Sequence, residues 1–286
     1  MAGRVSRFWW LFRRAWVLAY EENCLGISKG AAYSALLAFF PVLTTLATML
    51  VQARARAVSQ VLSSLLSEVV PPGSEQLVLD QFVVRGQRPA SLLVIAALVS
   101  LWGASGVMMS LMEGFNAVYH IPMRRSFLRQ RAVAALLVVA AIVPALGASA
   151  LILFGARTEQ ALLRWLAVLG PAEPLAGGVL LFGELARYVA ALGAIVVVMA
   201  VLYRLGPNRP QRWRDVWAGA LLATALWLAA TSLFGWYVRN IAGYNVLYGS
   251  IGAVIALIVW MYVLGVIAIA GCAFNVERER IRIAGG

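Results

Sequence analysis

The stretch YGSIGAVIALIVWMYVLGVIAIAGCA, from Tyr248 to Ala273, decides the fold class of this 286-residue chain. It is a continuous apolar run without a single Asp, Glu, Lys or Arg. A helix needs about 20 predominantly apolar residues to cross the hydrocarbon core of a bilayer. A strand of a membrane β-barrel is about half as long and alternates apolar with polar residues. The run therefore predicts a membrane-spanning helix.

Five further apolar runs of similar length precede this one. The chain is 62% hydrophobic and 13% charged, with a mean hydropathy of +0.84. A water-soluble domain averages roughly 45–50% apolar and 25% charged residues, so a soluble protein is excluded. We expect an all-α polytopic membrane protein with six transmembrane helices. The predicted spans cover residues 30–51, 90–112, 132–155, 181–203, 216–238 and 248–273.

The segments outside the spans are short. Residues 1–29 are rich in Trp, Arg and Tyr but interrupted by charges, which predicts an amphipathic helix lying in the membrane interface. Residues 52–89 place Val and Leu at three- and four-residue spacing, which predicts short external amphipathic helices. The expected organisation is an N-terminal interfacial segment at 1–29, one transmembrane domain at 30–273 and a C-terminal tail at 274–286.

The formal net charge of +12 is divided unevenly between the two sides of the predicted bundle. Sixteen Lys and Arg residues fall on the side that holds both termini, and seven fall on the opposite side. The cytoplasmic side normally carries the excess of Lys and Arg, so we expect both termini in the cytoplasm. A basic rim also attracts anionic lipid headgroups. Nucleic acid is not an expected partner, because the sequence shows no soluble module that gathers these residues.

A polar, glycine-rich stretch, GYNVLYGSIGA from Gly243 to Ala253, opens the sixth span at its external end. Tyr244 and Tyr248 are four residues apart and share a helix face, which suits the aromatic belt of a membrane interface. Small residues spaced by four let a second helix approach closely. The predicted packing residues are Gly249, Gly252, Ala253 and Ala256.

Two charged residues, Glu184 and Arg187, stand near the start of the fourth span and share a helix face. Such charges either face a bundle interior or wet cavity, or extend to the outer interface. Together with the opening of the sixth span they give a candidate external cavity. Its candidate residues are Glu184, Arg187, Tyr244, Asn245, Tyr248 and Ser250.

On the cytoplasmic side, guanidinium groups are suited to hold phosphate headgroups, because arginine binds phosphate bidentately. The candidate headgroup contacts are Arg124, Arg125, Arg212 and Arg214. Glu113 and Asn116 mark the cytoplasmic end of the second span, where they either line an inner vestibule or cap helix ends.

An enzyme is not expected from these residues. His120 is the single histidine of the chain, and the sequence shows no cluster suited to zinc or to a two-metal site. It contains neither a P-loop nor a G-x-S-x-G motif. Cys24 and Cys272 have no partners at metal-ligand spacing and are interpreted as packing residues. We therefore expect no catalytic residues, no metal and no cofactor.

Four stretches resemble the YihY/BrkB family of bacterial inner-membrane proteins, once mislabelled ribonuclease BN. They are KGAAYSALLAFFPVL (29–43), LWGASGVMMSLMEGFNAVYHIPMRRSFLRQR (101–131), GPNRPQRWRDVWAGALLATALW (206–227) and YGSIGAVIALIVWMYVLGVIAIAGCAFNVERER (248–280). The resemblance implies a six-helix inner-membrane protein linked in general terms to envelope integrity and to lipid or lipopolysaccharide-precursor trafficking. Ala273 stands where the family usually has a glutamate, in the motif GAELNAE, whereas Asn275 and Glu277 match. Proton coupling through that position is therefore not expected.

The leading hypothesis is a transporter or translocator of envelope lipid or another amphiphile in the inner membrane, with anionic membrane lipids as partners. The alternative is a structural or accessory membrane protein that supports the envelope through a protein partner and moves nothing itself. In that case residues 52–89 would form the docking surface.

Overall fold

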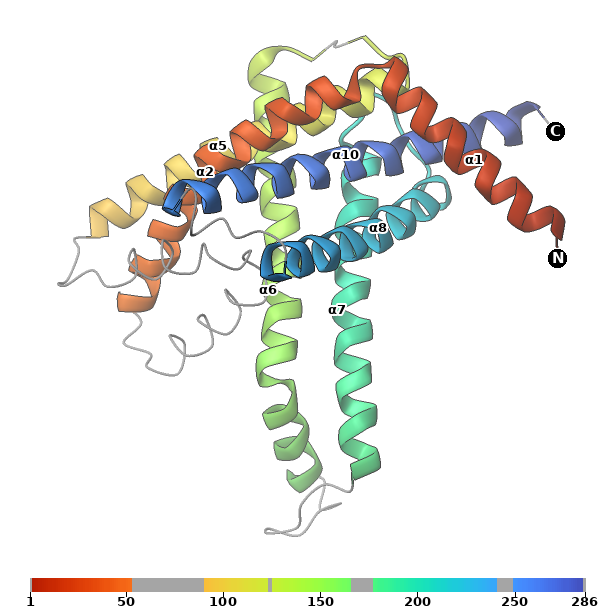
Figure 1. The fold of residues 1–286 in the computed structure, drawn as a ribbon. Coiled ribbons are helices and arrows are strands. Elements are labelled where there is room, and N and C mark those ends of the chain that lie inside the picture. Colours follow the sequence, from red (N-terminus) through yellow and green to blue (C-terminus); the bar gives the residue numbers. More distant parts are fainter. Residues whose placement is uncertain (1, 53–89, 123–124, 166–176, 241–248, 285–286) are drawn as a thin grey trace.

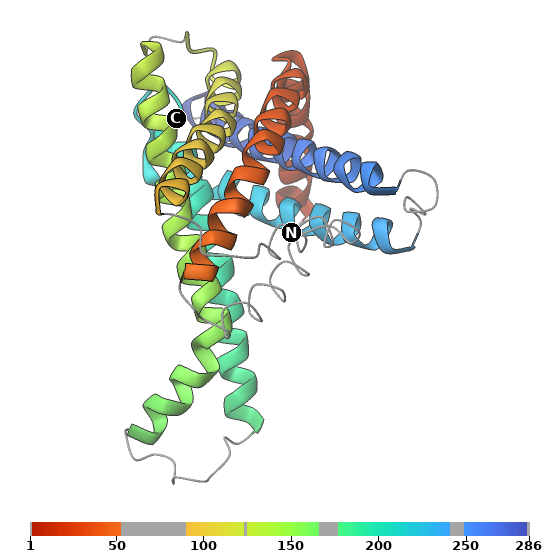
Figure 2. The same ribbon diagram turned by 90° about the vertical axis from the view of Figure 1, so that its left-hand side faces the viewer.

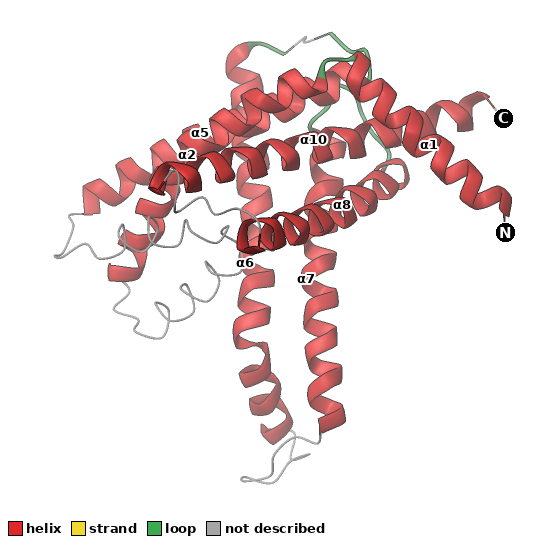
Figure 3. Ribbon diagram, in the orientation of Figure 1, coloured by secondary structure: helices red, strands yellow, loops and turns green. Residues whose placement is uncertain are grey.

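The computed structural model describes residues 2–52, 90–122, 125–165, 177–240 and 249–284, and their regular structure is helical throughout (Figures 1 and 3). Six of the helices in these ranges, all except α1, are long and apolar enough to cross a membrane, which confirms the predicted fold class. The helices are α1 (Ala2–Glu21), α2 (Cys24–Gln52), α5 (Ala90–Val118), α6 (Phe127–Trp165), α7 (Gly177–Leu205), α8 (Trp213–Asn240) and α10 (Gly249–Ala284).

The helices extend beyond the predicted spans. The region predicted as a separate C-terminal tail continues α10 to Ala284, and α2 begins at Cys24, six residues before the predicted span at residue 30. A hydropathy run ends where charges begin, but a helix continues as long as its backbone hydrogen bonds do. Residues 2–21 are helical, as predicted. The short external helices predicted in residues 52–89 lie outside the described residues.

Successive membrane-length helices pack as three antiparallel pairs, α2 with α5, α6 with α7 and α8 with α10. One end of the bundle, here called the basic end, holds the starts of α2, α6 and α8 and the ends of α5, α7 and α10. The pairs lie close together at the basic end and point away from it in different directions (Figures 1 and 2). The elements that meet at this end are therefore the ones able to build a site from several parts of the sequence.

Compact helix ends keep the connections at the basic end short. α5 ends in a Schellman motif, in which Ile121 N donates to Asn116 O at 2.9 Å and His120 N donates to Ala117 O at 2.8 Å. His120 holds the left-handed conformation that this motif requires, with φ 54°. Asn23 has the same conformation, with φ 53°, in the two-residue turn between α1 and α2. Local geometry thus fixes the end of α5 and the turn between α1 and α2.

The central helix of the bundle is α10. Inside the protein, 50% of its apolar span is buried, against 17–28% for the other five membrane-length helices. It packs against α1, α2, α5 and α8. Gly219 of α8 and Gly271 of α10 allow a close approach, since a Cβ on Gly271 would lie 2.7 Å from Ala223 Cβ. A Cβ on Gly219 would run into the Gly271 carbonyl oxygen. Small residues at this contact let two backbones meet.

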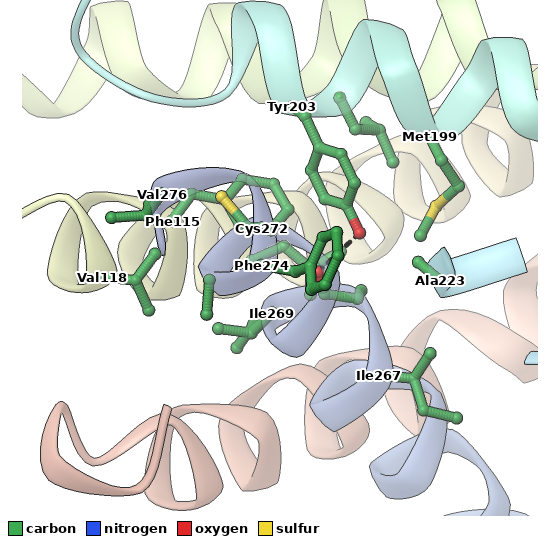
Figure 4. Packing of buried hydrophobic residues seen from close by; sticks show 14 of the residues in the cluster. Phe115, Val118, Met199, Tyr203, Ala223, Ile267, Ile269, Cys272, Phe274 and Val276 are labelled. Carbon is green, nitrogen blue, oxygen red and sulfur yellow. Dashed lines mark hydrogen bonds between the residues drawn. The ribbon is translucent and has the colours of Figure 1, made fainter. Parts of the chain in front are cut away.

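α7 joins this core through Tyr203, which is 1% exposed. Its hydroxyl donates to the carbonyl oxygen of Ala268 in α10 at 2.8 Å (Figure 4). Its ring meets Phe115 of α5 edge-on, with 5.4 Å between the ring centroids. A buried phenol needs such a partner, because an unpaired hydroxyl in an apolar core is costly. One side chain therefore ties α5, α7 and α10 together next to the basic end.

Candidate functional site: an arginine-lined pocket

An open pocket of about 420 Å³ lies at the basic end, between the α5–α6 and α7–α8 connections. The described residues that line it include four arginines and no acidic residue. The volume falls within the range of roughly 300–1,000 Å³ that is typical of small-ligand sites. We call it the arginine pocket; it is lined by Arg125, Arg129, Arg204, Leu205, Pro207, Asn208, Arg209 and Pro210.

The α7–α8 connection forms one wall of the pocket and is anchored to α5 and to the α5–α6 connection. Asn208 N donates to the side-chain oxygen of Asn116 in α5 at 2.8 Å. Arg125 Nη2 donates to the carbonyl oxygen of Pro207 at 3.4 Å. Pro207 and Pro210 restrict the backbone dihedral φ, which stiffens this short segment. The two connections are thus held in a fixed relation.

Two of the lining arginines stack on aromatic rings. The Arg204 guanidinium carbon lies 4.2 Å from the ring centroid of Trp213, and that of Arg209 lies 4.8 Å from the ring centroid of Tyr119. Arg209 also pairs with Glu279 of α10, with 2.5 Å between Nη2 and Oε1. Burial raises the pKa of Tyr119 well above its usual range, so its ring presents a neutral face to Arg209. Stacking orients both arginines without consuming all of their donors.

Arg125 is crowded by like charge. Burial, with a smaller contribution from the Arg129 guanidinium, lowers the pKa of Arg125 below its usual value. Both effects disfavour a cation at this position. The side chain still remains charged at neutral pH, because an arginine starts from a very high pKa. The pocket is therefore electropositive, with a cost that an anion would relieve.

Of the four arginines predicted as headgroup contacts, Arg125 lines the pocket. Arg212 and Arg214 are exposed and lie outside the lining, and Arg214 Nε is 3.8 Å from Asp215 Oδ1. Arg124 lies outside the described residues. Whether any of the four contacts a headgroup stays a prediction.

The pocket is completed by Arg129, Arg204 and Arg209, which were predicted only as part of the general basic rim. The signal that could have identified two of them is the segment RLGPNRP, residues 204–210. Its glycine and two prolines make the connection tight, so the arginines at its start and within it remain close in space.

Glu113 and Asn116, proposed to line an inner vestibule, differ in environment. Glu113 is exposed, whereas Asn116 is 1% exposed and positions the α7–α8 connection through its bond to Asn208 N. Asn116 thus supports the wall of the arginine pocket without belonging to its lining.

The candidate external cavity lies largely beyond the described part of the chain. Tyr244, Asn245 and Tyr248 are outside it, and the side chain of Ser250 is too. In α7, Glu184 is exposed and Arg187 is half-buried, one turn apart. The external site therefore stays a prediction.

Of the residues predicted to pack helices at the start of α10, three are buried: Gly252, Ala253 and Ala256. Gly249 is the first residue of α10. Ala273, at the position where the family motif carries glutamate, is fully buried in the core. A carboxylate at that position would need a partner inside the bundle.

Comparison with known proteins identifies the family of this chain. A family model described as virulence factor BrkB matches residues 15–285. The chain belongs to the virulence factor BrkB family. This confirms the resemblance drawn from the sequence and, with the six membrane-length helices, identifies an integral membrane protein. No solved structure matches the chain significantly.

Several curated BrkB relatives are bacterial proteins without an assigned activity in their names. A UPF0761 membrane protein of Alkalilimnicola ehrlichii is 30% identical over 262 residues, covering 89% of this chain and 55% of the relative. One of Neisseria meningitidis serogroup B is 26% identical over 258 residues, covering 89% and 60%. The chain thus spans little more than half the length of these relatives. The Bacillus subtilis protein YfkH, named as ribonuclease-like, is 28% identical over 264 residues, covering 87% and 89%.

The described residues contain no group of three His, Cys, Asp or Glu side chains placed to hold a metal ion. The ribonuclease-like name belongs to YfkH, and no enzyme activity is established for this BrkB family member. What the geometry offers at the basic end is a pocket lined by arginines.

Proposed function

We propose that this BrkB family member binds anionic amphiphiles, phospholipids among them, at the arginine pocket and moves them between the leaflets of the bacterial inner membrane. The observation that carries the proposal is the lining of the pocket, with four guanidinium groups and no carboxylate. Guanidinium groups are suited to phosphate because their planar fork donates two parallel hydrogen bonds.

In this function the basic end of the bundle lies on the cytoplasmic side of the membrane. The excess of Lys and Arg at this end supports that orientation, because cytoplasmic loops of membrane proteins are enriched in basic residues. Anionic lipids of the inner leaflet would then lie next to the pocket, and the basic rim would raise their local concentration.

Apolar side chains beside the arginines favour an amphiphile over a fully polar ligand. Leu205 lines the pocket and is 42% exposed. Phe127 and Leu128, which precede Arg129 at the start of α6, are 62% and 78% exposed. Such exposed apolar groups suit contact with acyl chains while the arginines hold a charged head.

Lipid movement in proteoliposomes tests this function. A tail-labelled anionic phospholipid is placed in both leaflets, and an impermeant quencher destroys the label in the outer leaflet. If the protein moves the lipid, the remaining fluorescence decays faster than in protein-free vesicles. We expect the double variant R125Q/R204Q to slow this decay about tenfold, since a charge-assisted hydrogen bond contributes roughly 1.5–3 kcal/mol.

The matched control is R13Q/R278Q, which removes the same charge from exposed positions outside the pocket lining. It should leave the rate close to that of the unaltered protein. A decay no faster than in protein-free vesicles would contradict a translocator and favour the accessory role. Equal slowing by both double variants would show that net charge, and not the pocket, governs the movement.

A further inference from the structure

Three of the four guanidinium groups in the arginine pocket have no acidic partner among the described residues. Among the ion pairs formed by the described residues, Arg209 pairs with Glu279, whereas Arg125, Arg129 and Arg204 occur in none. The lining adds no carboxylate. The pocket therefore concentrates uncompensated positive charge within one small volume.

The pocket also contains hydrogen-bond donors that nothing in the described structure satisfies. Arg125 Nη1, Arg204 Nη1 and Asn208 Nδ2 are buried and have no hydrogen-bond partner. A buried donor without a partner carries a desolvation penalty, which is larger for charged groups. An oxygen-rich anion would supply acceptors to these side chains after small rotations of their terminal groups.

The donors come from two segments far apart in the sequence. Arg125 and Arg129 belong to the α5–α6 connection and the start of α6, whereas Arg204 and Asn208 belong to the end of α7 and the α7–α8 connection. The bonds from Asn208 N to Asn116 and from Arg125 to Pro207 hold these segments together. A ligand between them would therefore meet donors on opposite sides, in a frame that is largely preorganised.

We propose that the arginine pocket is a binding site for a doubly charged phosphate group, the terminal group of a phosphomonoester, held chiefly by Arg125, Arg129 and Arg204. The same chemistry is carried by a lipid such as phosphatidic acid or by a soluble phosphate; the lipid form rests on the function proposed above. In either form the ligand bridges the α5–α6 and α7–α8 connections.

The charge and shape of the group distinguish it from other anions. A carboxylate carries one negative charge and two acceptor atoms in a plane, which fits one guanidinium fork. A phosphomonoester carries about two negative charges near neutral pH and three terminal oxygens arranged in a pyramid. Three guanidinium groups from two segments match that arrangement. A phosphodiester offers one charge and two terminal oxygens, so it would leave one arginine unpaired.

Two arms test the site in the full-length protein and separate the sources of the phosphate. In detergent, isothermal titration with inorganic phosphate measures binding of the soluble group. In the lipid arm, native mass spectrometry compares phosphatidic acid, a phosphomonoester, with phosphatidylglycerol, a phosphodiester with the same acyl chains. We expect phosphatidic acid to bind more tightly than phosphatidylglycerol. Inorganic phosphate should bind more tightly at about pH 7.5 than at about pH 5, because its second proton leaves near neutral pH, so the doubly charged form is abundant only at the higher pH.

Three single variants make the test specific. R204Q and R129Q should each weaken binding about tenfold, while R278Q, at an exposed position outside the lining, should leave it unchanged. Arg129 is exposed, so R129Q removes a pocket charge with little effect on the fold, which size-exclusion chromatography would verify. Binding in the lipid arm alone would assign the phosphate to a lipid, and binding in both arms would show that the phosphate group suffices.

Equal binding by the R129Q, R204Q and R278Q variants would overturn the site, and so would equal binding of the monoester and the diester. These results are separable from the function proposed above. Phosphate binding without lipid movement would support the phosphate site and contradict the proposed lipid translocation. If lipid still moved at the normal rate in the R129Q and R204Q variants, lipid translocation would be supported and the phosphate site would be contradicted.

Discussion

The side-chain oxygen of Asn275 in α10 accepts a hydrogen bond from the backbone nitrogen of Gly219 in α8 at 2.7 Å. The amide nitrogen of Asn275 in turn donates to the carbonyl oxygen of Val216 at 3.1 Å. Asn275 is 2% exposed, so both bonds lie inside the bundle. They join the central helix to the start of α8, which follows directly on the connection that walls the arginine pocket.

We expect Gly219→Ala to destabilise the protein. The added methyl group would collide with the Gly271 carbonyl oxygen and the Asn275 amide, so the two helices must separate. Overpacking of this kind typically costs about 1–3 kcal/mol, partly offset by about 1 kcal/mol from the higher helix propensity of alanine. Thermal unfolding in detergent should show a lower midpoint.

The matched control is Gly193→Ala in α7, where an added Cβ would have no atom within 4 Å. This variant should keep or raise the midpoint. If Gly219→Ala were as stable as Gly193→Ala, the close approach of α8 and α10 would be contradicted.

Tyr203→Phe should lower stability by roughly 0.5–1.5 kcal/mol, the usual net contribution of one hydrogen bond. The substitution keeps the edge-on ring contact with Phe115 and removes the bond to the Ala268 carbonyl. Tyr188→Phe is the control, because Tyr188 in the same helix is 53% exposed. Denaturant or thermal unfolding of the two variants side by side would test this. Equal stability of both would show that the buried hydroxyl contributes nothing.

The number and type of the main elements were predictable because lipid imposes a simple rule. A span must be about 20 apolar residues long and must satisfy its own backbone, so runs such as 248–273 are identifiable without knowing their neighbours. The helix ends were less predictable. α10 continues to Ala284 through charged residues whose partners come from elsewhere, as in the pair formed by Arg282 and Asp215. Such pairs depend on tertiary structure.

The candidate site was predictable in its chemistry and only partly in its residues. The basic rim indicated anion binding, and Arg125 was among the arginines singled out. Arg204 and Arg129 are 75 positions apart in the sequence, and their proximity arises because α6 begins and α7 ends at the basic end. Arg212 is as basic as Arg209 and three residues away, yet it points outside the lining. Periodicity alone does not distinguish them, because the connection is irregular.

Glu277→Gln should loosen α1 from the bundle. Glu277 is 3% exposed and contacts Arg14 of α1 at 3.3 Å and Arg280 at 2.8 Å. Removing one partner of a largely buried pair leaves charge uncompensated, although the exposed arginines reduce the penalty to about 1–3 kcal/mol. Limited trypsin digestion should therefore cleave faster at Arg7, Arg13 and Arg14.

Glu113→Gln serves as the control for that digestion, because Glu113 is exposed and occurs in no ion pair among the described residues. It should leave cleavage of α1 unchanged. Equal protection of α1 in both variants would mean that its apolar stripe, and not Glu277, holds it to α10.

We expect α1 to lie in the membrane interface, with one face on the bundle and another toward lipid. Leu11, Ala15, Leu18 and Ala19 are buried. A second face carries Trp9 and Trp16, which are 66% and 37% exposed and each lie within 6.3 Å of the ring centroid of Phe12. α1 is joined to the membrane-length helix α2 by two residues, so its end must lie at the membrane surface. The aromatic face should therefore enter the lipid interface.

Single labels at Trp9→Cys and Arg7→Cys test this placement, because residues two apart project from nearly opposite sides of a helix. The native Cys24 and Cys272 are buried, which leaves the introduced thiol as the accessible target among the described residues. In proteoliposomes, a fluorophore at position 9 should be quenched by lipid-borne bromine and protected from iodide. A fluorophore at position 7 should show the reverse. Equal iodide quenching at both positions would place α1 in water, away from the bilayer, and remove its role as an interfacial anchor.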